Sequence, residues 1–349
     1  MKKILINLFL FLSAFILISC DKERKDFEGS FTSMGDALIG LKVYNEDENI
    51  AKADELFLLI KERIEKINKL TDNFKSYDGF NNVKYINDNP LEKIEIEEEL
   101  FNILELAEEQ RISTNGYFDI SIGLIIDEWK KLLDSNKEIT EDDITKTEEI
   151  VDKILIVENG ILLEKDDGKF YITIKSGVKI DLGALAKGYA INVANDILRD
   201  NGITKYMLTG SNSSAYYGVN PRRDNKMFII GLVGPSEFLE QTGENYYGII
   251  LVNNTSITTS GDSIQRVKVG EKIIHHIISP KTKRPEIFRS MVTIYHEDAG
   301  AADALTTALM AMPKDVFDKW YSDNSDTLMV VLESDMSVNM YLPDDLIGK

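Results

Sequence analysis

The stretch that most constrains this chain is residues 181–192, where a strand-like run, a Gly turn and a helix follow one another. Upstream, Gly177–Ile180 alternates apolar residues as a strand does. Downstream, one bulky and one small apolar stripe recur every four residues, which predicts a helix packed closely on a neighbour. The bulky stripe is Leu185, Tyr189, Val193 and Ile197, and the small stripe is Ala186, Ala190, Ala194 and Leu198.

The start of such a helix is a natural anion site. Its first N–H groups are unpaired, the helix dipole is positive there, and Lys187 adds a full charge one turn in. The alternative is a plain strand–helix corner, with Asp181 as a cap and Lys187 in solvent.

The charge balance limits the possible partners. The 349 residues, enough for one large or two ordinary domains, include 40 Lys and Arg against 59 Asp and Glu, a net charge of −19. Such a chain repels nucleic acid and anionic lipid headgroups, so we expect no electrostatic binding to either. A phosphate-binding site in this chain therefore needs local cations or a metal.

The N-terminus has the pattern of a bacterial lipoprotein signal. Lys2 and Lys3 precede an apolar run over residues 4–18, and Cys20, the only cysteine, follows directly. We expect a signal peptide at 1–19, a lipidated Cys20, a tether over 20–29 and a folded domain at 30–345, held on the extracytoplasmic side of a bacterial membrane. The alternative is an uncleaved anchor helix, for which the run is short.

Helical periodicity dominates the first half of the chain and short strand-like runs the second, which predicts an α+β fold of mixed sheets with packed helices. We expect a strand pair within 31–44 and helices at 51–70, 95–112, 140–154, 185–198, 301–312 and 315–321. Residues 71–90 and 258–262 are expected to be loops, and 272–276 a strand.

Several polar side chains stand where chemistry is possible. Asp303 and Thr307 share one helix face and form a hard-oxygen pair suited to Mg²⁺, or else a first-turn acid and a Thr bonded to its own helix. Thr259 and Ser260 could meet a phosphate or a flavin edge, or simply form a hairpin turn. His275 and His276 should point to opposite sides, so one of them at most serves as a base at a given site. No metal-ligand spacing indicates zinc.

Taken in order, six segments between residues 31 and 312 resemble the ApbE family, the FAD:protein FMN transferases. The segments that carry this resemblance are 34–35, 116–123 with Trp129, 181–189, 259–262, 275–278 and 302–308.

The resemblance implies an α+β, ApbE-like (T-fold-like) domain that uses FAD as its substrate and Mg²⁺ as its cofactor. Asp303, Thr307 and the main-chain carbonyl of Ala184 would hold Mg²⁺. The implied FAD contacts are Met34, Phe118, Asp119, Asp181, Lys187, Thr259, Ser260, His276 and Ile278. The implied reaction transfers FMN to a Ser or Thr hydroxyl of a partner, expected to be a membrane redox protein, and releases AMP, with His276 as the base. A hydrolase that releases FMN and AMP, or a non-catalytic FAD-binding lipoprotein, would use the same site.

The loop after His276 departs from the family pattern. Ser279 and Lys283 stand where the family has Asp and Gly. The Gly position is expected to be left-handed, which costs a non-Gly residue about 1–2 kcal/mol. We expect these changes to loosen the segment that positions His276.

Overall fold

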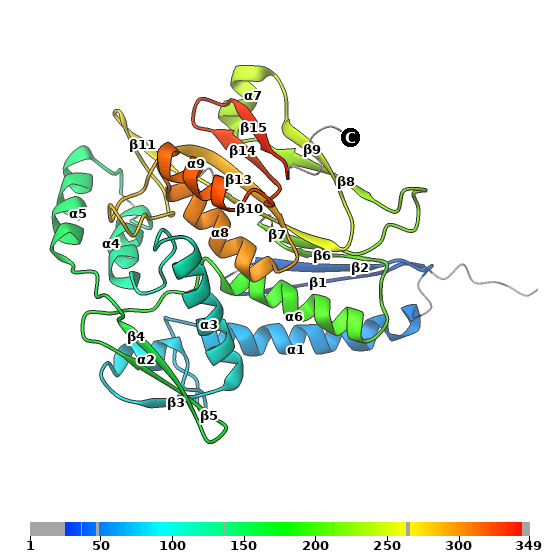
Figure 1. Ribbon diagram of the computed structural model, residues 1–349, viewed down its shortest axis with the longest axis horizontal. Coiled ribbons are helices and arrows are strands. Elements are labelled where there is room, and N and C mark those ends of the chain that lie inside the picture. Colours follow the sequence, from blue (N-terminus) through cyan, green and yellow to red (C-terminus); the bar gives the residue numbers. More distant parts are fainter. Residues whose placement is uncertain are drawn as a thin grey trace, which may run out of the picture.

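An antiparallel sheet of eight strands forms the centre of the protein (Figure 1). The structure is a computed structural model that describes residues 25–35, 37–46, 49–135, 137–211, 213–262 and 266–343. The predicted signal peptide and Cys20 lie outside these residues. In sheet order the strands are β1 (Phe27–Ser33), β2 (Ala37–Val43), β6 (Tyr206–Gly210), β7 (Ser214–Tyr217), β10 (Thr255–Gly261), β13 (Arg289–His296), β14 (Met329–Glu333) and β15 (Val338–Tyr341).

Helices cover one face of this sheet. They are α1 (Ala53–Thr71, after the short 3-10 helix η1, Ile50–Lys52), α3 (Glu98–Ser113), α6 (Ala186–Asp200), α8 (Ala299–Ala311) and α9 (Lys314–Asp323). Apolar residues at helical spacing, such as Ile60, Ile64 and Ile67 of α1, are fully buried in the core beneath the sheet. Helix α8 packs on β10 and β13, and α6 packs on β6, β7 and α8.

A two-stranded hairpin covers part of the opposite face. Strands β8 (Phe228–Val233) and β9 (Tyr246–Val252), joined through α7 (Ser236–Thr242), bury every second side chain against the sheet. The inward residues include Phe228, Leu232 and Ile250, which pack in one cluster with Ile257 and Val330 of the sheet.

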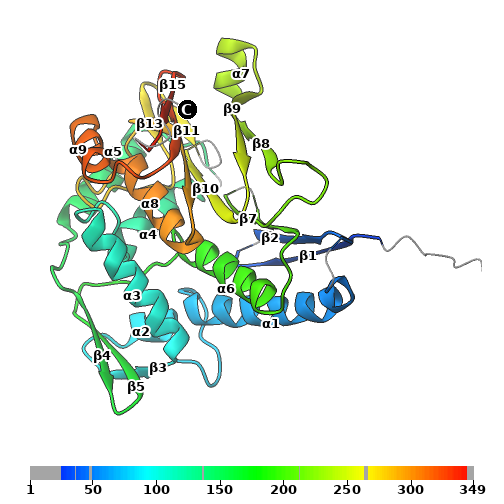
Figure 2. The same ribbon diagram turned by 45° about the vertical axis from the view of Figure 1, so that its right-hand side comes forward.

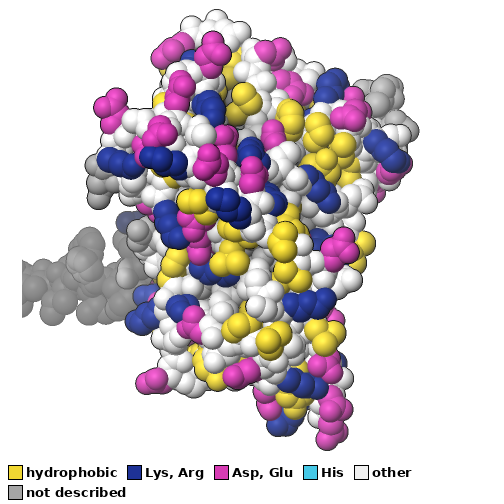
Figure 3. All heavy atoms as spheres, turned by 90° about the vertical axis from the view of Figure 1, so that its left-hand side faces the viewer, with side chains coloured by type: hydrophobic (Ala, Val, Ile, Leu, Met, Phe, Trp, Pro, Cys, Tyr) yellow, Lys and Arg dark blue, Asp and Glu magenta, His cyan; other side chains and the backbone are white. Residues whose placement is uncertain are grey.

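Two smaller units complete the described chain (Figure 2). One is the sheet β3-β5-β4 (Ile94–Ile96, Lys169–Ile174 and Ile161–Asp166) with α2 (Val83–Asp88) nearby. The other joins α4 (Gly123–Leu133) and α5 (Glu141–Lys153) to the hairpin β11–β12 (Val267–Val269 and Lys272–Ile274) around the buried ring of Trp129. Acidic and basic side chains are interspersed on the face that carries this unit (Figure 3). No helix in the described part of the chain is both long and apolar enough to span a bilayer.

The predicted α+β class is confirmed, and so are the main helices. Helix α5 starts as expected at a capping box of Thr140 with Asp143. Helix α2 was not expected inside 71–90, where Asn82 caps it by accepting from the amide of Tyr85 at 3.0 Å. Residues 258–261, expected as loop, belong to β10.

Two further expectations need correction. Residues 27–29, assigned to the tether, belong to β1, because the Phe27 ring packs on Phe57 with centroids 5.4 Å apart. Residues 177–180 do not form a strand of a sheet and contribute only a parallel bridge between Lys179 and Ile122.

The tightest helix contact lies at Gly188, in the first turn of α6. A Cβ atom placed on Gly188 would lie 2.0 Å from the carbonyl oxygen of Ala299 in α8. The predicted small stripe of Ala186, Ala190, Ala194 and Leu198 is buried in the core but does not include Gly188. Only a residue without a side chain allows the approach of Gly188 to α8.

Replacing Gly188 with Ala should therefore force α6 and α8 apart. We expect Gly188→Ala to lower the free energy of unfolding by about 1–3 kcal/mol, the usual cost of overpacking. Urea denaturation measures the change, and Gly183→Ala is the control, because its Cβ would approach only the Asp181 carboxylate, at 3.0 Å. Equal stability of the two variants would contradict the close packing.

Candidate active site

Two turns and the end of a third strand meet at one end of the large sheet. The β1–β2 turn contains Met34, in a left-handed conformation with φ of 55°. Beside it, the amide of Ser211 in the β6–β7 turn donates to the carbonyl of Leu38 at 2.7 Å. The C-terminal end of β10 follows, with the amide of Thr259 donating to the carbonyl of Ser213 at 2.7 Å. The predicted residues Met34, Thr259 and Ser260 therefore lie at a common end.

Helix α6 starts at this same end. It runs antiparallel to β6, because Ile191 lies against Gly210 while Asn195, one turn later, accepts a hydrogen bond from Tyr206. No side chain caps its N-terminus at Leu185. The positive end of the helix dipole therefore faces the site, as the sequence predicts.

The carboxylate of Asp303 stands beside the first turn of α6. It is only 4% exposed, and its Oδ2 accepts a hydrogen bond from the amide of Gly188 at 3.2 Å. Burial raises its pKa, while the charge of Lys187 and the bond from Gly188 act in the opposite direction. A buried carboxylate in this setting is stabilised in its charged form by a cation.

The neighbouring oxygen atoms fit Mg²⁺. Thr307 is half-buried, the one residue of α8 that is not buried, and its hydroxyl donates to the carbonyl of Asp303 at 3.0 Å, which leaves its lone pairs available. Within the described residues no hydrogen bond reaches the carbonyl of Ala184, because the amide of Gly188 donates to Asp303 instead. Oxygen donors of this kind suit Mg²⁺. No cluster of three or more His, Cys, Asp or Glu able to hold a metal occurs in the part of the chain that the structure describes.

Lys187 lies between Asp303 and the histidine loop. Its Nζ donates to the carbonyl of Gly183 at 3.1 Å. Its positive charge lowers the pKa of both Asp303 and His276. Lys187, Asp303 and His276 are far apart in the sequence but lie close enough for the charge of Lys187 to act on both other side chains.

The two neighbouring histidines occupy opposite environments, as predicted. His275 is fully buried, with Nε2 2.9 Å from the carbonyl of Glu286, and its Nδ1 accepts from the amide of Ile277 at 3.2 Å. His276 is exposed to solvent at one edge but otherwise surrounded by protein. This desolvation, with the charge of Lys187, lowers the pKa of His276 to about 4. The expected strand 272–276 ends at Ile274, so both histidines lie in irregular backbone.

Asp181 is held in place rather than free. Its Oδ2 accepts from Asn73 Nδ2 and its Oδ1 from the amide of Gly183, both at 2.8 Å. The preceding residue, Ile180, exchanges two hydrogen bonds with the side chain of Asn87, at 2.7 and 2.9 Å. Asn73 was not identified from the sequence, because nothing in its local pattern shows a partner 108 residues away.

Strand alternation separates Thr259 from Ser260. The Ser260 hydroxyl faces α8, 2.8 Å from the hydroxyl of Thr306 and 3.4 Å from that of Thr307. The Thr259 hydroxyl points to the opposite face, 2.8 Å from that of Thr293. A ligand contact through the Thr259 side chain is therefore not supported, because adjacent strand residues face opposite ways.

Two other predicted contact residues have buried side chains. Phe118 and Ile278 are 4% and 6% exposed and belong to hydrophobic clusters. The neighbouring Asp119 is half-buried and accepts from the amide of Ser121 at 2.8 Å. The side chains of Phe118 and Ile278 therefore shape the walls of the site through core packing.

The loop after His276 is well anchored, contrary to the expected loosening. Lys283 does adopt the left-handed conformation, with φ of 62°. Its carbonyl accepts from Trp129 Nε1 and its Nζ donates to the carbonyl of Ile154, both at 2.8 Å. Ser279 is fully buried and its amide donates to the carbonyl of Arg284 at 2.9 Å. Hydrogen bonds to Trp129, Ile154 and Arg284 therefore hold Ser279 and Lys283 in place.

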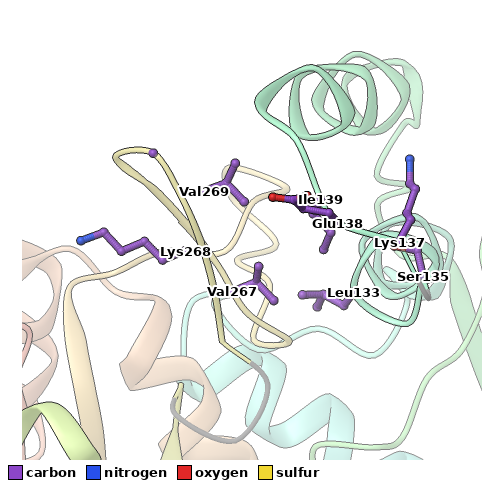
Figure 4. A pocket seen from close by; sticks show the side chains of 9 residues that line it. Leu133, Ser135, Lys137, Glu138, Ile139, Val267, Lys268 and Val269 are labelled. Atoms are coloured by element: carbon purple, nitrogen blue, oxygen red, sulfur yellow. The ribbon is translucent and has the colours of Figure 1, made fainter.

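One crevice in the described part of the chain is separate from this site. It has a volume of about 460 Å³ and lies between α4–α5 and β11. Figure 4 shows Leu133, Ile139 and Val267 facing it, while Lys268 points away. Its lining also includes Ser135, Lys137 and Glu138, and none of the predicted site residues borders it. A smaller cavity of about 250 Å³ borders Asn73 and Asn87, next to the segment that holds Asp181.

Comparison with known proteins agrees with this geometry. The ApbE family model matches residues 36–332. A FAD:protein FMN transferase of Vibrio cholerae is 25% identical over 304 residues, covering 86% of this chain and 85% of that protein. A FAD:protein FMN transferase of Buchnera aphidicola is 23% identical over 308 residues, covering 87% of this chain and 85% of that protein.

Solved structures share the fold. The ApbE protein of Thermotoga maritima matches with a TM-score of 0.74 at 23% identity, covering 93% of this chain and 99% of that one. The flavin transferase ApbE of Vibrio cholerae matches with a TM-score of 0.70 at 20% identity, covering 91% and 97%. The chain belongs to the ApbE family, as the sequence motifs predicted.

The buried His275 should make stability depend on pH. Burial lowers its pKa to about 4 from an ordinary 6.5. The unfolded chain therefore binds the extra proton between these values, and stability falls as the pH drops from 6.5 to 4, by up to about 3 kcal/mol. In urea titrations across this range, His275→Asn should show a shallower pH dependence than the wild-type protein. His296→Asn controls for the loss of an imidazole. Parallel curves for wild type and His275→Asn would contradict this reading.

Proposed function

We propose that this protein is a Mg²⁺-dependent FAD:protein FMN transferase that acts on a Ser or Thr hydroxyl of a partner protein. The observation that carries the proposal is the contact of Asp303 with Gly188, which brings an oxygen-ligand site against a helix N-terminus bearing Lys187. The pyrophosphate of FAD needs positive charge, and the chain as a whole carries −19. The names of the relatives support the same activity.

In the proposed reaction the acceptor hydroxyl oxygen attacks the FMN-side phosphorus of FAD. A new P–O bond forms to the acceptor, the P–O bond to the AMP phosphate breaks, and AMP leaves with the electron pair. The hydroxyl proton passes to the imidazole of His276, which is neutral at pH 7 because its pKa is lowered to about 4. Lys187 and the N-terminus of α6 hold the phosphate oxygens.

Asp303, Thr307 and the carbonyl of Ala184 are the ligands we assign to Mg²⁺. When bound, the ion stabilises negative charge on the phosphate oxygens during transfer. The amide of Gly188 keeps one carboxylate oxygen oriented, while Ser260 buttresses the Thr307 hydroxyl. The acceptor would be a membrane redox protein, reached from the extracytoplasmic side by an enzyme anchored through a lipidated Cys20.

Incubating the protein with FAD, Mg²⁺ and a candidate acceptor tests the proposal. FMN attached covalently to the acceptor, with one AMP released for each FMN, is the expected result. Free FMN with AMP would identify a hydrolase, and bound but intact FAD a carrier protein.

Replacing the metal carboxylate should abolish the reaction. We expect Asp303→Ala to lose AMP release at every Mg²⁺ concentration, because the remaining ligands are neutral oxygens. Asp298→Asn is the matched control, since it removes a carboxylate from the same helix but keeps a side chain able to cap it. AMP release is followed chromatographically, and normal turnover in Asp303→Ala would overturn the metal assignment.

Removing the Lys187 charge should weaken substrate binding. We expect Lys187→Met to lower FAD affinity by about 1–3 kcal/mol, the range for losing a hydrogen bond to a charged group. Arg199→Met, at the far end of α6, serves as the control. Fluorescence titration with FAD gives both dissociation constants, and an unchanged value for Lys187→Met would place that side chain outside the binding site.

A further inference from the structure

The outward face of the β8–β9 hairpin is apolar, although it faces solvent. Its exposed residues form cross-strand neighbours, with Ile229 opposite Leu251 and Val233 opposite Tyr246. Together with Ile249, which is 68% exposed, they form one continuous surface that we call the hairpin face. Isolated exposed apolar residues are common, but five on one side of a two-stranded sheet indicate a contact surface.

Charge is distributed unevenly along this hairpin. The loop that leads into β8 carries three exposed cations, Arg222, Arg223 and Lys226, and one exposed acid, Asp224. At the opposite end, the α7 turn carries the exposed acids Glu237, Glu240 and Glu244. In a protein with net charge −19, the cationic loop marks the one end of the hairpin face that suits an anionic surface.

The cationic end of the hairpin lies next to the start of the folded chain. The Asp26 carboxylate accepts two hydrogen bonds from Arg222, at 2.7 and 2.9 Å. Figures 1 and 2 both show β8 and β9 on the side of the molecule where β1 begins. Asp26 is six positions after Cys20 in the sequence, so a lipid on Cys20 would keep Asp26 within about 20 Å of the membrane.

We propose that the hairpin face, with Arg223 and Lys226 at its edge, rests on the lipid bilayer and fixes the orientation of the anchored enzyme. This inference rests on the lipid anchor at Cys20 and not on the transferase chemistry. The apolar residues would enter the headgroup region, and the cations would meet anionic lipid phosphates. Because the net charge opposes long-range attraction, the contact depends on the anchor, which supplies a high local concentration.

The chain offers a clean way to test this contact. Cys20 is the only cysteine and would be lipidated, so a cysteine introduced by substitution is the only free thiol in the mature protein. We would attach an environment-sensitive fluorophore to Ile249→Cys, and for comparison to Leu162→Cys on β4, whose side chain is 54% exposed. Both lipidated proteins are reconstituted into vesicles of phosphatidylethanolamine with 30% phosphatidylglycerol (about a third anionic lipid, within the range of membrane surfaces), with and without brominated acyl chains.

We expect a blue shift and quenching by brominated lipid at position 249, with neither at 162. Adding Arg223→Ser and Lys226→Ser should reduce the quenching at 249, whereas Lys165→Ser with Lys169→Ser on the distant β4–β5 hairpin should not. Equal emission at the two positions would overturn the proposal. A blue shift at position 249 that appears only when an acceptor protein is present would also overturn it. So would a blue shift that increases with protein density but is not quenched by brominated lipid, which would indicate contact with a second copy of the protein.

Two controls separate this proposal from the others. Vesicle flotation of the wild-type protein and of Cys20→Ser tests the anchor without reference to the hairpin. FMN transfer measured in detergent tests the enzyme activity without a bilayer. The hairpin proposal therefore fails on its own if the protein floats with vesicles and transfers FMN, but the fluorophore at position 249 shows the emission of a water-exposed site.

Discussion

The contact between α6 and α8 is the interaction on which the site depends. The absent side chain at Gly188 lets the two helices approach until its amide can donate to Asp303. That one hydrogen bond withdraws the amide from the carbonyl of Ala184 and directs the Asp303 carboxylate toward the start of α6. A buried carboxylate, an unpaired carbonyl and a helix N-terminus thus meet because two backbones touch. A buried carboxylate is costly without a partner. Together, these groups form the cation site that we propose, next to a helix N-terminus that suits an anion.

Much of this arrangement could be predicted from the sequence. The two apolar stripes over residues 185–198 predicted helix α6 and its burial, and the four-residue spacing of Asp303 and Thr307 predicted a shared helix face. Family membership followed from ordered motifs such as 181–189 and 302–308. These features are local in the chain, where periodicity and motif spacing carry the information.

The expectations that failed depend on distant partners or on backbone irregularity. The family resemblance implied that Thr259 contacts the ligand, and its segment was read as a loop. Strand β10 instead turns the Thr259 side chain to the far face of the sheet. The segment after His276 was expected to be loose because Asp and Gly are missing, but Trp129 and the carbonyl of Ile154 provide other anchors. Asn73 and Asn87 fix the Asp181 segment across a large gap in the sequence. No local pattern reports such contacts.

The burial of helix α8 limits which substitutions this enzyme can tolerate. All of its residues except Thr307 are buried, so it is both the centre of the core and the support of the assigned metal ligands. A substitution that disturbs Asp303 also disturbs packing, and a substitution that disturbs packing moves Asp303. Chemistry and folding are therefore under selection at the same positions. A substitution tolerated in α8 must therefore suit both the core and the assigned ligands, whereas the exposed loops carry no such double constraint.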